Sequence, residues 1–300
     1  MKYHKPVLLQ ESVDGLAVKP DGVYVDVTFG GGGHSREILK RLGPEGRLIA
    51  FDQDRDALKN KIDDPRFLLI HQNFRMLRRY LRFYKYETVD GILADLGVSS
   101  YQFDVPERGF SIRFDSELDM RMDTDVDFSA KTVVNTYDQY KLRQILADYG
   151  ELRNAAQLAR AIVEAREENE LRTTGQLRQA LEKFLPPHRE NRILAQVFQA
   201  IRIEVNQELE SLKEFLLQTA EVLRPGGRLS VISYHSLEDR LVKRFMRSGL
   251  FEGEPEKDMY GRVSVPFKNI GRFIVPSEEE IEENNRARSA KLRIAERLDS

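Results

Sequence analysis

The chain has 300 residues, 41% of them hydrophobic and 32% charged, which predicts one or two folded domains with a sizeable core and excludes a disordered chain. The 47 basic and 49 acidic residues leave a net charge of −2, so any nucleic-acid contact must come from local basic patches. Cysteine is absent, which excludes disulfides, thiolate metal sites and any mechanism with a cysteine nucleophile.

The N-terminal residues lack the apolar stretch of a secretion signal. Their only apolar run is residues 7–9, which Gln10 and Glu11 follow at once. No segment of the chain approaches the ~20 consecutive apolar residues that span a bilayer. We therefore expect a soluble, cytoplasmic protein with no membrane partner.

The first third of the chain alternates short β-branched runs with helical segments. Strands are predicted over residues 23–28, 47–52, 67–71 and 89–96, and a helix over residues 34–42. This alternation is typical of an α/β fold in which helices cover a mostly parallel sheet.

The middle of the chain breaks the alternation. Residues 97–127 are rich in turn formers and carboxylates, and residues 129–223 follow a helical period, interrupted at Pro186-Pro187. Thr173 and Gln176 have the spacing of a capping box. An all-helical domain inserted at residues 105–205, between two parts of an α/β domain at 1–104 and 206–300, is therefore predicted.

The alternation resumes near residue 224. The sequence predicts a turn at 224–227, a strand over 228–234 and a helix over 236–247. The segments GRVSV, GRFIV and AKLRIAERL could each add an edge strand after that helix.

A glycine-rich loop follows the first predicted strand, in the sequence DVTFGGGGHS at residues 26–35. Such a loop brings the backbone close to a ligand. The dinucleotide fingerprint fails because Ser35 or Arg36 stands where its last glycine is needed, which argues against a nicotinamide-dependent oxidoreductase, and no phosphate-binding lysine follows. A nucleotide-like ligand without a pyrophosphate remains, and S-adenosylmethionine fits.

Two aspartates end predicted strands where such a ligand would bind. Asp52 lies about twenty residues after the loop, where a carboxylate can accept hydrogen bonds from both ribose hydroxyls. The alternative is a turn or helix-capping aspartate. Asp95 ends the fourth strand, and its alternative role is to cap the turn at Gly97.

Several longer segments resemble the bacterial 16S ribosomal RNA cytosine-N4 methyltransferases, and the match covers almost the whole chain. They are DVTFGGGGHS, FDQD, DGILADLGVSSYQFD, RGFS, LDMRMD, QAIRIEVNQEL, PGGRLSVISYHSLEDRLVK and RARSAKLR. The resemblance implies a Rossmann-like class I methyltransferase sheet with a helical insertion. It also implies S-adenosylmethionine as methyl donor and a cytidine in the decoding region of 16S rRNA as acceptor.

The resemblance also assigns residues to the cofactor. They are Gly32, Gly33, His34, Asp52, Phe74, Asp95 and Gln102. Three features depart from the family's pattern: Val27 stands for a small residue, Tyr234 stands for the usual Phe before His235, and the segment over residues 247–276 is short. No metal site is expected.

The chemistry of cytosine narrows the acceptor atom. Methylation of C5 needs a cysteine nucleophile, so that route is closed to this chain, whereas methylation of the exocyclic N4 needs only an acceptor for the amino proton. The resemblance, and not this elimination, favours N4 over a ribose oxygen. Asp95 is the first candidate acceptor. DLGV stands where related N-methyltransferases have an Asp/Asn-Pro-Pro-aromatic turn, so a backbone carbonyl could serve instead, and a DNA N4-methyltransferase is disfavoured.

His235 is the second catalytic candidate, as a base or as a donor that orients the ring. The alternative is that residues 235–239 begin a helix, with Ser236 as the cap and Glu238 and Asp239 favouring its N-terminus.

Other charged segments have a structural and a functional interpretation. In LDMRMD, Asp119, Arg121 and Asp123 are expected to form an ion-paired clamp opposite two packed methionines. Residues 74–86 are expected to be an amphipathic helix with a solvated basic face, and the alternative is RNA contact. Candidate phosphate contacts are Arg108, Arg113, Arg189, Arg192, Arg202, Arg286, Arg288, Lys291 and Arg293.

These inferences predict an enzyme that methylates N4 of a decoding-region cytidine in 16S rRNA. Its partner would be 16S rRNA or the 30S subunit, and the protein would be a monomer or a weak homodimer. The alternative is a non-catalytic ribosome assembly factor that binds S-adenosylmethionine.

Overall fold

The computed structural model describes residues 6–255, 259–261 and 263–299, and the chain divides into two compact units. The sheet unit comprises Met1–Gly97 and Leu209–Ser300, and the helical unit is Val98–Glu208. The sequence predicts domain borders after residues 104 and 205, whereas the chain passes from one unit to the other after Gly97 and again after Glu208. Residues 1–5 of the predicted N-terminal segment and Arg262 of GRVSV lie outside the described residues.

The sheet unit is built on a seven-stranded sheet in the order β3-β2-β1-β4-β5-β7-β6. Its strands are β1 (Val23–Asp26), β2 (Arg47–Asp52), β3 (Phe67–His71), β4 (Val89–Asp95), β5 (Leu223–Ser233), β6 (Phe267–Asn269) and β7 (Lys291–Arg297). The first five strands pair in parallel, and β7 pairs antiparallel with both β5 and β6. The predicted α/β fold is confirmed, and its strand order reverses between β1 and β4.

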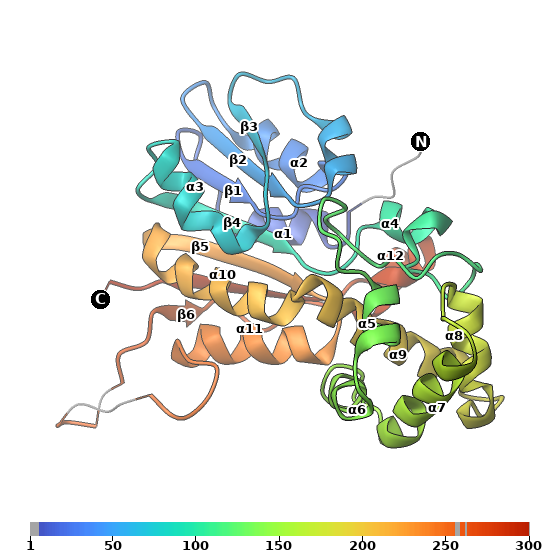
Figure 1. Ribbon diagram of the computed structural model, residues 1–300. Coiled ribbons are helices and arrows are strands. Elements are labelled where there is room, and N and C mark those ends of the chain that lie inside the picture. The colour runs from blue at the N-terminus through green and yellow to red at the C-terminus, as the bar shows by residue number, and fades with distance from the viewer. Residues whose placement is uncertain (1–5, 256–258, 262, 300) are drawn as a thin grey trace. The chain divides into compact units, whose positions relative to one another are not determined.

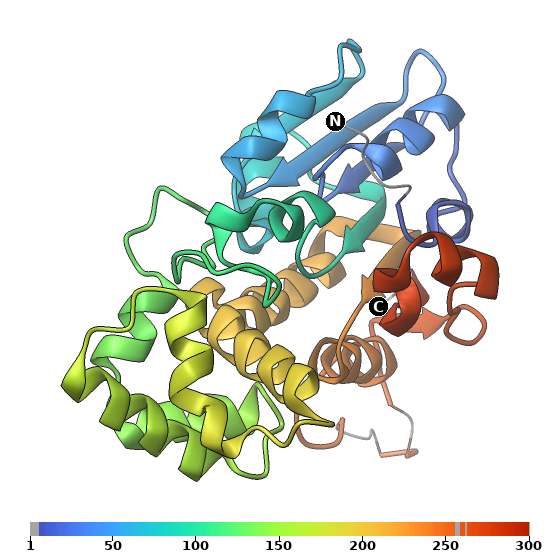
Figure 2. The same cartoon turned by 90° about the vertical axis from the view of Figure 1, so that its right-hand side faces the viewer.

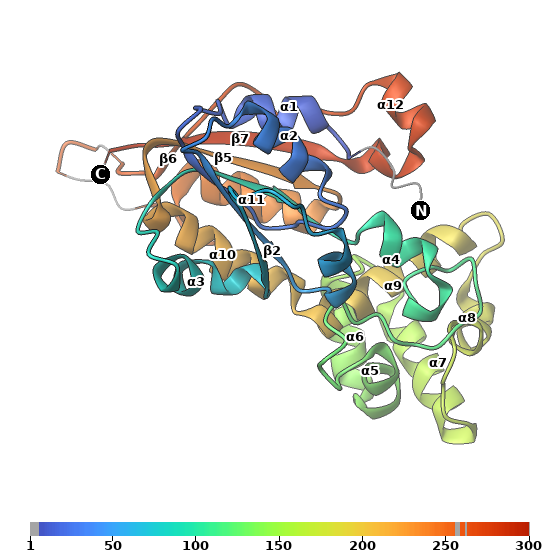
Figure 3. The same cartoon turned by 90° about the horizontal axis from the view of Figure 1, so that it is seen from above.

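Helices cover both faces of this sheet (Figures 1 and 3). They are α1 (Leu9–Gly15), α2 (Gly33–Arg41), α3 (Leu77–Phe83), α10 (Glu208–Val222) and α11 (Ser236–Ser248). The short helix α12 (Glu278–Glu283) belongs to the same unit, and its Glu280 accepts a hydrogen bond from the Leu8 N–H. Alternate residues of β2 enter different cores: Leu48 packs in the cluster with α1 and α2, whereas Ile49 packs in the cluster with α3, α10 and α11. Both faces are therefore buried, as parallel strands require.

The later strands differ from the sequence prediction. β5 begins at Leu223, so the predicted turn at 224–227 falls within the strand, where Gly226 has a φ of +77° and the register with β4 shifts. A glycine in this conformation bends the chain without ending its pairing. AKLRIAERL supplies β7, but the described parts of GRVSV and GRFIV form no named strand, and β6 lies between these two segments.

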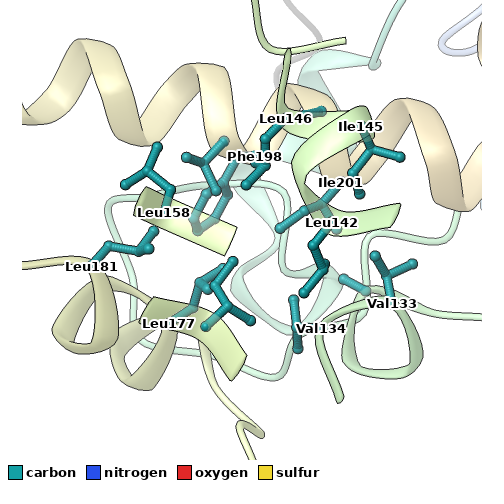
Figure 4. Packing of buried hydrophobic residues seen from close by; sticks show 14 of the residues in the cluster. Val133, Val134, Leu142, Ile145, Leu146, Leu158, Leu177, Leu181, Phe198 and Ile201 are labelled. Carbon is teal, nitrogen blue, oxygen red and sulfur yellow. The ribbon is translucent and has the colours of Figure 1, made fainter. Parts of the chain in front are cut away.

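The helical unit contains α4 (Ser100–Asp104), α5 (Ala130–Thr136), α6 (Gln139–Asp148), α7 (Ala155–Glu168), α8 (Thr174–Leu181) and α9 (Glu190–Asn206), which run from green to yellow in Figure 2. Its helices enclose a hydrophobic cluster of their own, to which Leu142, Leu158, Leu177 and Phe198 contribute (Figure 4). Thr173 and Gln176 form the predicted capping box of α8. The proline pair precedes α9, where a helix break is predicted.

The LDMRMD segment belongs to this unit and is partly as predicted. Met120 and Met122 are buried in its core, and Arg121 Nε donates to Asp119 Oδ1 at 2.7 Å. Asp123 instead accepts from the backbone N–H of Asp125. The ion pair thus joins two residues rather than three.

No helix within the described residues is long and apolar enough to cross a membrane.

Candidate active site

Three aspartates meet at one edge of the sheet. Asp26, Asp52 and Asp95 are the last residues of β1, β2 and β4, and parallel strands end on the same side of a sheet. The order of the strands reverses between β1 and β4, which is where open α/β sheets bind their ligands. This edge of the sheet unit is therefore the candidate site.

The glycine loop after β1 faces the same edge. Gly30 and Gly32 have φ angles of +51° and +76°, which favour glycine. A Cβ on Gly32 would lie 2.8 Å from the Phe29 ring, and a Cβ on Gly33 would lie 2.1 Å from Pro6 Cγ. Beside Gly30 the nearest atom to such a Cβ would be 4.0 Å away, so the loop leaves open space there for a ligand.

The Asp52 carboxylate is fixed by the loop that follows β1. Its Oδ2 accepts from the Gly30 N–H at 2.7 Å, and its Oδ1 accepts from the Asp54 N–H at 2.8 Å. Burial raises the pKa of Asp52 to about 6. Each oxygen has a second lone pair, so the carboxylate can still accept from two hydroxyl groups of a ribose.

Asp26 lies deeper and has only internal partners. Its Oδ2 accepts from the Ser35 hydroxyl at 2.6 Å, and its Oδ1 accepts from the Thr28 N–H at 3.2 Å. The side chain is fully buried, and this burial raises the pKa of Asp26 to about 6. Asp26 therefore joins the start of α2 to the end of β1 and adds negative charge behind the site.

Asp95 is held by two hydroxyl groups. Its backbone N–H donates to Thr28 Oγ1 at 2.6 Å, and its Oδ1 accepts from the Tyr234 hydroxyl at 2.7 Å. The side chain is 23% exposed. Burial raises the pKa of Asp95 to about 7, so a carboxylate at this position can exchange a proton near neutral pH.

His34 lies at the start of α2 with a buried ring. Its Nε2 is 3.3 Å from the Val7 carbonyl, and its Nδ1 is 3.8 Å from Asp95 Oδ2. Burial lowers the pKa of His34 to about 4, so the ring is neutral at pH 7. A neutral ring that donates from Nε2 to Val7 has no proton on Nδ1 to give to Asp95.

His235 caps α11, and the expectation that Ser236 is the cap is wrong. The His235 ring accepts at Nδ1 from the Glu238 N–H at 3.4 Å, while Glu238 Oε2 accepts from the N–H of His235 and, at 2.9 Å, of Tyr234. The backbone of His235 is extended, as a cap residue requires, so the hydrogen-bonding side chain is the imidazole rather than the next hydroxyl.

The remaining two predicted cofactor residues lie in different units. Phe74 follows β3 in the sheet unit and packs edge to face with Phe215, with ring centroids 5.3 Å apart. Gln102 is buried in the helical unit, where its side chain accepts from the Ser99 N–H and completes the capping box of α4. The structure thus places Gly32, Gly33, His34, Asp52, Phe74, Asp95 and His235 in the sheet unit, and Gln102 belongs to the helical unit.

The charge at the site suits a cationic ligand. Among the described residues, no lysine or arginine forms an ion pair with Asp26, Asp52 or Asp95, and Asp26 raises the pKa of both others through its charge. S-adenosylmethionine carries a positive sulfonium, a ribose and an amino acid. The uncompensated carboxylates, the open space beside Gly30 and the free lone pairs of Asp52 therefore fit it.

Several predicted phosphate contacts have structural partners instead. Arg108 is buried and donates to the carbonyls of Arg121 and Met122, so its assignment to phosphate is wrong. Arg202 pairs with Glu208 at 2.8 Å, and Lys291 and Arg293 both pair with Asp239. Arg113, Arg189, Arg192 and Arg288 are exposed and remain candidates, and Arg286 is half-buried.

The predicted basic helix is largely as expected. A 3-10 turn at Phe74–Met76 leads into α3, whose Leu77 and Leu81 are buried against the sheet. Arg75 pairs with Glu214 and Arg78 with Glu221, both on α10, so these two arginines hold a neighbouring helix.

Sequence reasoning missed two side chains that bind the aspartates. Thr28 and Tyr234 both contact Asp95, from positions 67 and 139 residues away in the chain. The sequence analysis identifies Tyr234 only as a departure from the family's pattern and predicts no contact for it. The available signal was that both residues end predicted strands, 23–28 and 228–234, as Asp95 lies at the end of its own strand.

Comparisons with known proteins agree over the whole chain. The sequence matches the profile of the MraW methylase family over residues 1–298. It is 66% identical over 298 residues to "Ribosomal RNA small subunit methyltransferase H" of Flavobacterium johnsoniae, covering 99% of each chain. It is 55% identical over 298 residues to the protein of that name in Bacteroides thetaiotaomicron, covering 99% of this chain and 98% of the relative.

Among solved structures, an rRNA methylase from Streptococcus thermophilus is similar at 14% identity with a TM-score of 0.43, over 97% of this chain and 96% of that one. On the full-length match to the family profile and the close relatives, the chain belongs to the MraW methylase family.

Proposed function

We propose that this methyltransferase, whose methyl donor is S-adenosylmethionine, modifies the exocyclic N4 of a cytidine in the decoding region of 16S rRNA. The relatives named ribosomal RNA small subunit methyltransferase H support a ribosomal RNA substrate. The absence of cysteine supports N4 over C5 as the acceptor atom.

One observation carries the proposal: Asp95 ends β4 beside the glycine loop with a partly exposed carboxylate and no cationic partner among the described residues. The amino nitrogen of cytosine is a poor nucleophile because its lone pair is delocalised into the ring. A carboxylate that accepts a hydrogen bond from this amino group increases the electron density on nitrogen and provides a place for its proton.

The reaction then balances with groups of this chain. When bound, S-adenosylmethionine supplies an electrophilic methyl group, and the N4 lone pair forms the new N–C bond while the C–S bond breaks and sulfur keeps its electron pair. Asp95 takes the proton that N4 loses and later releases it to solvent. The backbone carbonyls after Asp95 offer further acceptors for the second amino hydrogen.

The other site residues have supporting roles in this proposal. Asp52 binds the ribose hydroxyls, and the backbone from Gly32 to His34 lines the donor at the start of α2. Phe74 and Gln102 are the remaining proposed donor contacts. His235 is proposed to act at the cytosine through Nε2, a buried atom that lies 3.1 Å from Glu238 Oε1, while its Nδ1 is engaged in the helix cap.

RNA binding is assigned to the helical unit and to exposed basic side chains. Arg189 and Arg192 are exposed at the start of α9, and Arg113 is exposed in the same unit. Their charge is available to phosphates, unlike that of Arg108 or Arg202. We propose that the enzyme acts on the 30S subunit in the cytoplasm as a monomer or weak homodimer, and that the target base is unstacked to reach Asp95.

The test is transfer of tritiated methyl groups to 30S subunits from a strain without this activity, followed by nucleoside analysis of the RNA. N4-methylcytidine at a single decoding-region position is expected. Methylation at C5 or on a ribose, or donor binding without transfer to 30S subunits or free RNA, would overturn the proposal.

Substitution of Asp95 tests its role as acceptor in the same assay. Asp95→Ala should abolish turnover even at saturating S-adenosylmethionine. Asp64→Ala is the matched control, because Asp64 is also a half-buried carboxylate of the sheet unit but pairs with Arg66. A wild-type rate in Asp95→Ala would remove Asp95 from the chemistry.

A further inference from the structure

We propose that Tyr234 is a positioning residue for methyl transfer: its hydroxyl holds Asp95 Oδ1 by a hydrogen bond, favours the ionised carboxylate and leaves Oδ2 to receive the amino proton of the substrate. This inference rests on the proposed role of Asp95. It adds a residue that makes that role depend on pH.

The contact is short and specific. Tyr234 Oη lies 2.7 Å from Asp95 Oδ1, and a phenol at this distance from a carboxylate is the donor. Tyr234 is the only side chain of the described residues that donates a hydrogen bond to the Asp95 carboxylate. The second oxygen, Oδ2, lies 3.8 Å from Nδ1 of the neutral His34 ring.

The tyrosine itself is fixed by its surroundings. Its backbone N–H donates to Glu238 Oε2 at 2.9 Å, which anchors it to the first turn of α11. Its ring packs against the buried cluster of Leu8, Ile232 and Leu292. Because backbone and ring are both held, the hydroxyl can direct Asp95 rather than follow it.

Titratable groups on β1, α2 and α11 surround the pair of Tyr234 and Asp95. Asp26 on β1 and Glu238 on α11 act on Asp95 as negative charges and raise its pKa, and His34 on α2 is neutral at pH 7. Against them, the Tyr234 hydrogen bond lowers the pKa of Asp95.

The tyrosine keeps its proton throughout the working range. Burial first, and then the charge of Asp95, raise the pKa of Tyr234 well above its usual value, and Glu238 on α11 and Glu280 on α12 act in the same direction. The phenol therefore remains a donor while Asp95 titrates.

Removal of the Tyr234 hydroxyl should shift the pH dependence of activity in one direction. Asp95 must be ionised to accept a proton, so activity is present above its pKa and is lost as pH falls through it. Without the phenol, Asp95 ionises only at higher pH. The acid limb of the pH–rate profile should therefore move upward when the hydroxyl is removed.

The experiment compares kcat/KM for methyl transfer to unmodified 30S subunits between pH 5.5 and 9.5 in wild type and Tyr234→Phe. We expect the acid limb of Tyr234→Phe to move up by about 0.5 to 1 pH unit, the effect of one lost hydrogen bond to a carboxylate. Activity should fall at pH 6.5 and return close to the wild-type rate at pH 9.

Tyr24→Phe is the matched control. Tyr24 is also a buried tyrosine of the sheet unit, and its hydroxyl accepts from the Lys19 N–H rather than contacting the site. It should leave the acid limb in place. An unshifted limb in Tyr234→Phe, or a loss of activity by the same factor at every pH, would overturn the proposal.

A second readout needs no catalysis and separates this inference from the proposed function. The difference in unfolding free energy between wild type and Asp95→Asn, followed against pH, reports the titration of Asp95 in the folded state. Repeating it in the Tyr234→Phe background should move that titration to higher pH. If Asp95→Asn methylates at the wild-type rate, the proposed acceptor fails, whereas an unmoved stability titration contradicts the role of Tyr234 alone.

Discussion

The three aspartates of the site differ in how many of their carboxylate lone pairs are occupied by hydrogen bonds from neighbouring groups. Asp26 has its oxygens occupied by Ser35 and Thr28 inside the sheet unit. Asp52 is fixed by two backbone N–H groups but keeps lone pairs for a ligand, and only one side-chain oxygen of Asp95 accepts a hydrogen bond from the described residues. The same side chain thus has a structural, a binding and a proposed catalytic role, depending on which donors surround it.

The sequence predicted two of these three aspartates as site residues. Asp52 and Asp95 end predicted strands, and the ends of parallel strands must share an edge, so their proximity follows from local pattern alone. The contact between Tyr234 and Asp95 spans 139 residues and depends on β5 lying beside β4. No local pattern encodes that pairing, and this is why the tyrosine's partner was missed.

Replacing Asp52 tests its role in binding the ribose. Asp52→Ala should weaken S-adenosylmethionine binding by ~1–3 kcal/mol, because hydrogen bonds to a charged acceptor are lost. Isothermal titration calorimetry measures the change. Asp56→Ala, which removes a nearby carboxylate paired with Lys59, should bind normally, and unchanged affinity in Asp52→Ala would exclude the ribose role.

At the scale of elements, the strands of the first third follow the predicted ranges closely because each is a short, mostly apolar run with a clear stop. The predicted start of β5 is wrong because the glycines at 226 and 227 suggest a turn. The chain bends there but still pairs with β4. The cap of α11 was wrong because hydroxyl side chains are the usual caps. Here the extended backbone conformation falls on His235.

The glycine loop makes a prediction at this scale. Gly32→Ala places a Cβ in left-handed backbone and within 2.8 Å of the Phe29 ring, so the loop must shift. Gly226→Ala is the matched control, because its φ is also positive but no atom lies within 4 Å of the added Cβ.

Both variants should lose stability from backbone strain of about 1–2 kcal/mol. Only Gly32→Ala should also weaken S-adenosylmethionine binding, by roughly tenfold for each ~1.4 kcal/mol of loop distortion. Calorimetric titration of both variants with S-adenosylmethionine measures the two affinities. Equal affinities in the two would mean that the loop's shape does not matter to the donor.

At the scale of the whole molecule, the chain has separate hydrophobic cores. Leu158 belongs to the cluster of the helical unit, and Ile92 belongs to a cluster of the sheet unit. Helical periodicity predicted that the middle of the chain forms a unit of its own. It could not give the exact borders, because residues 97–127 have no regular period and join the helical unit through packing of residues such as Phe110 and Leu118.

Because the two units have separate cores, a substitution in one core should reduce hydrogen-exchange protection mainly in its own unit. Leu158→Ala and Ile92→Ala remove matched volumes from fully buried positions, and each should cost ~2–5 kcal/mol. Hydrogen exchange should then rise mainly in residues 98–208 for the first variant and mainly in the sheet unit for the second. A uniform rise across both units in either variant would show that the chain unfolds as one cooperative body.

The place of β7 has a consequence for the order of assembly during synthesis. β7 is the last strand of the chain, yet it lies between β5 and β6 and pairs with both. Until it emerges from the translating ribosome, β5 has an open edge next to the position where Tyr234 meets Asp95. A nascent chain therefore holds the glycine loop and the aspartates long before the sheet that supports them is closed.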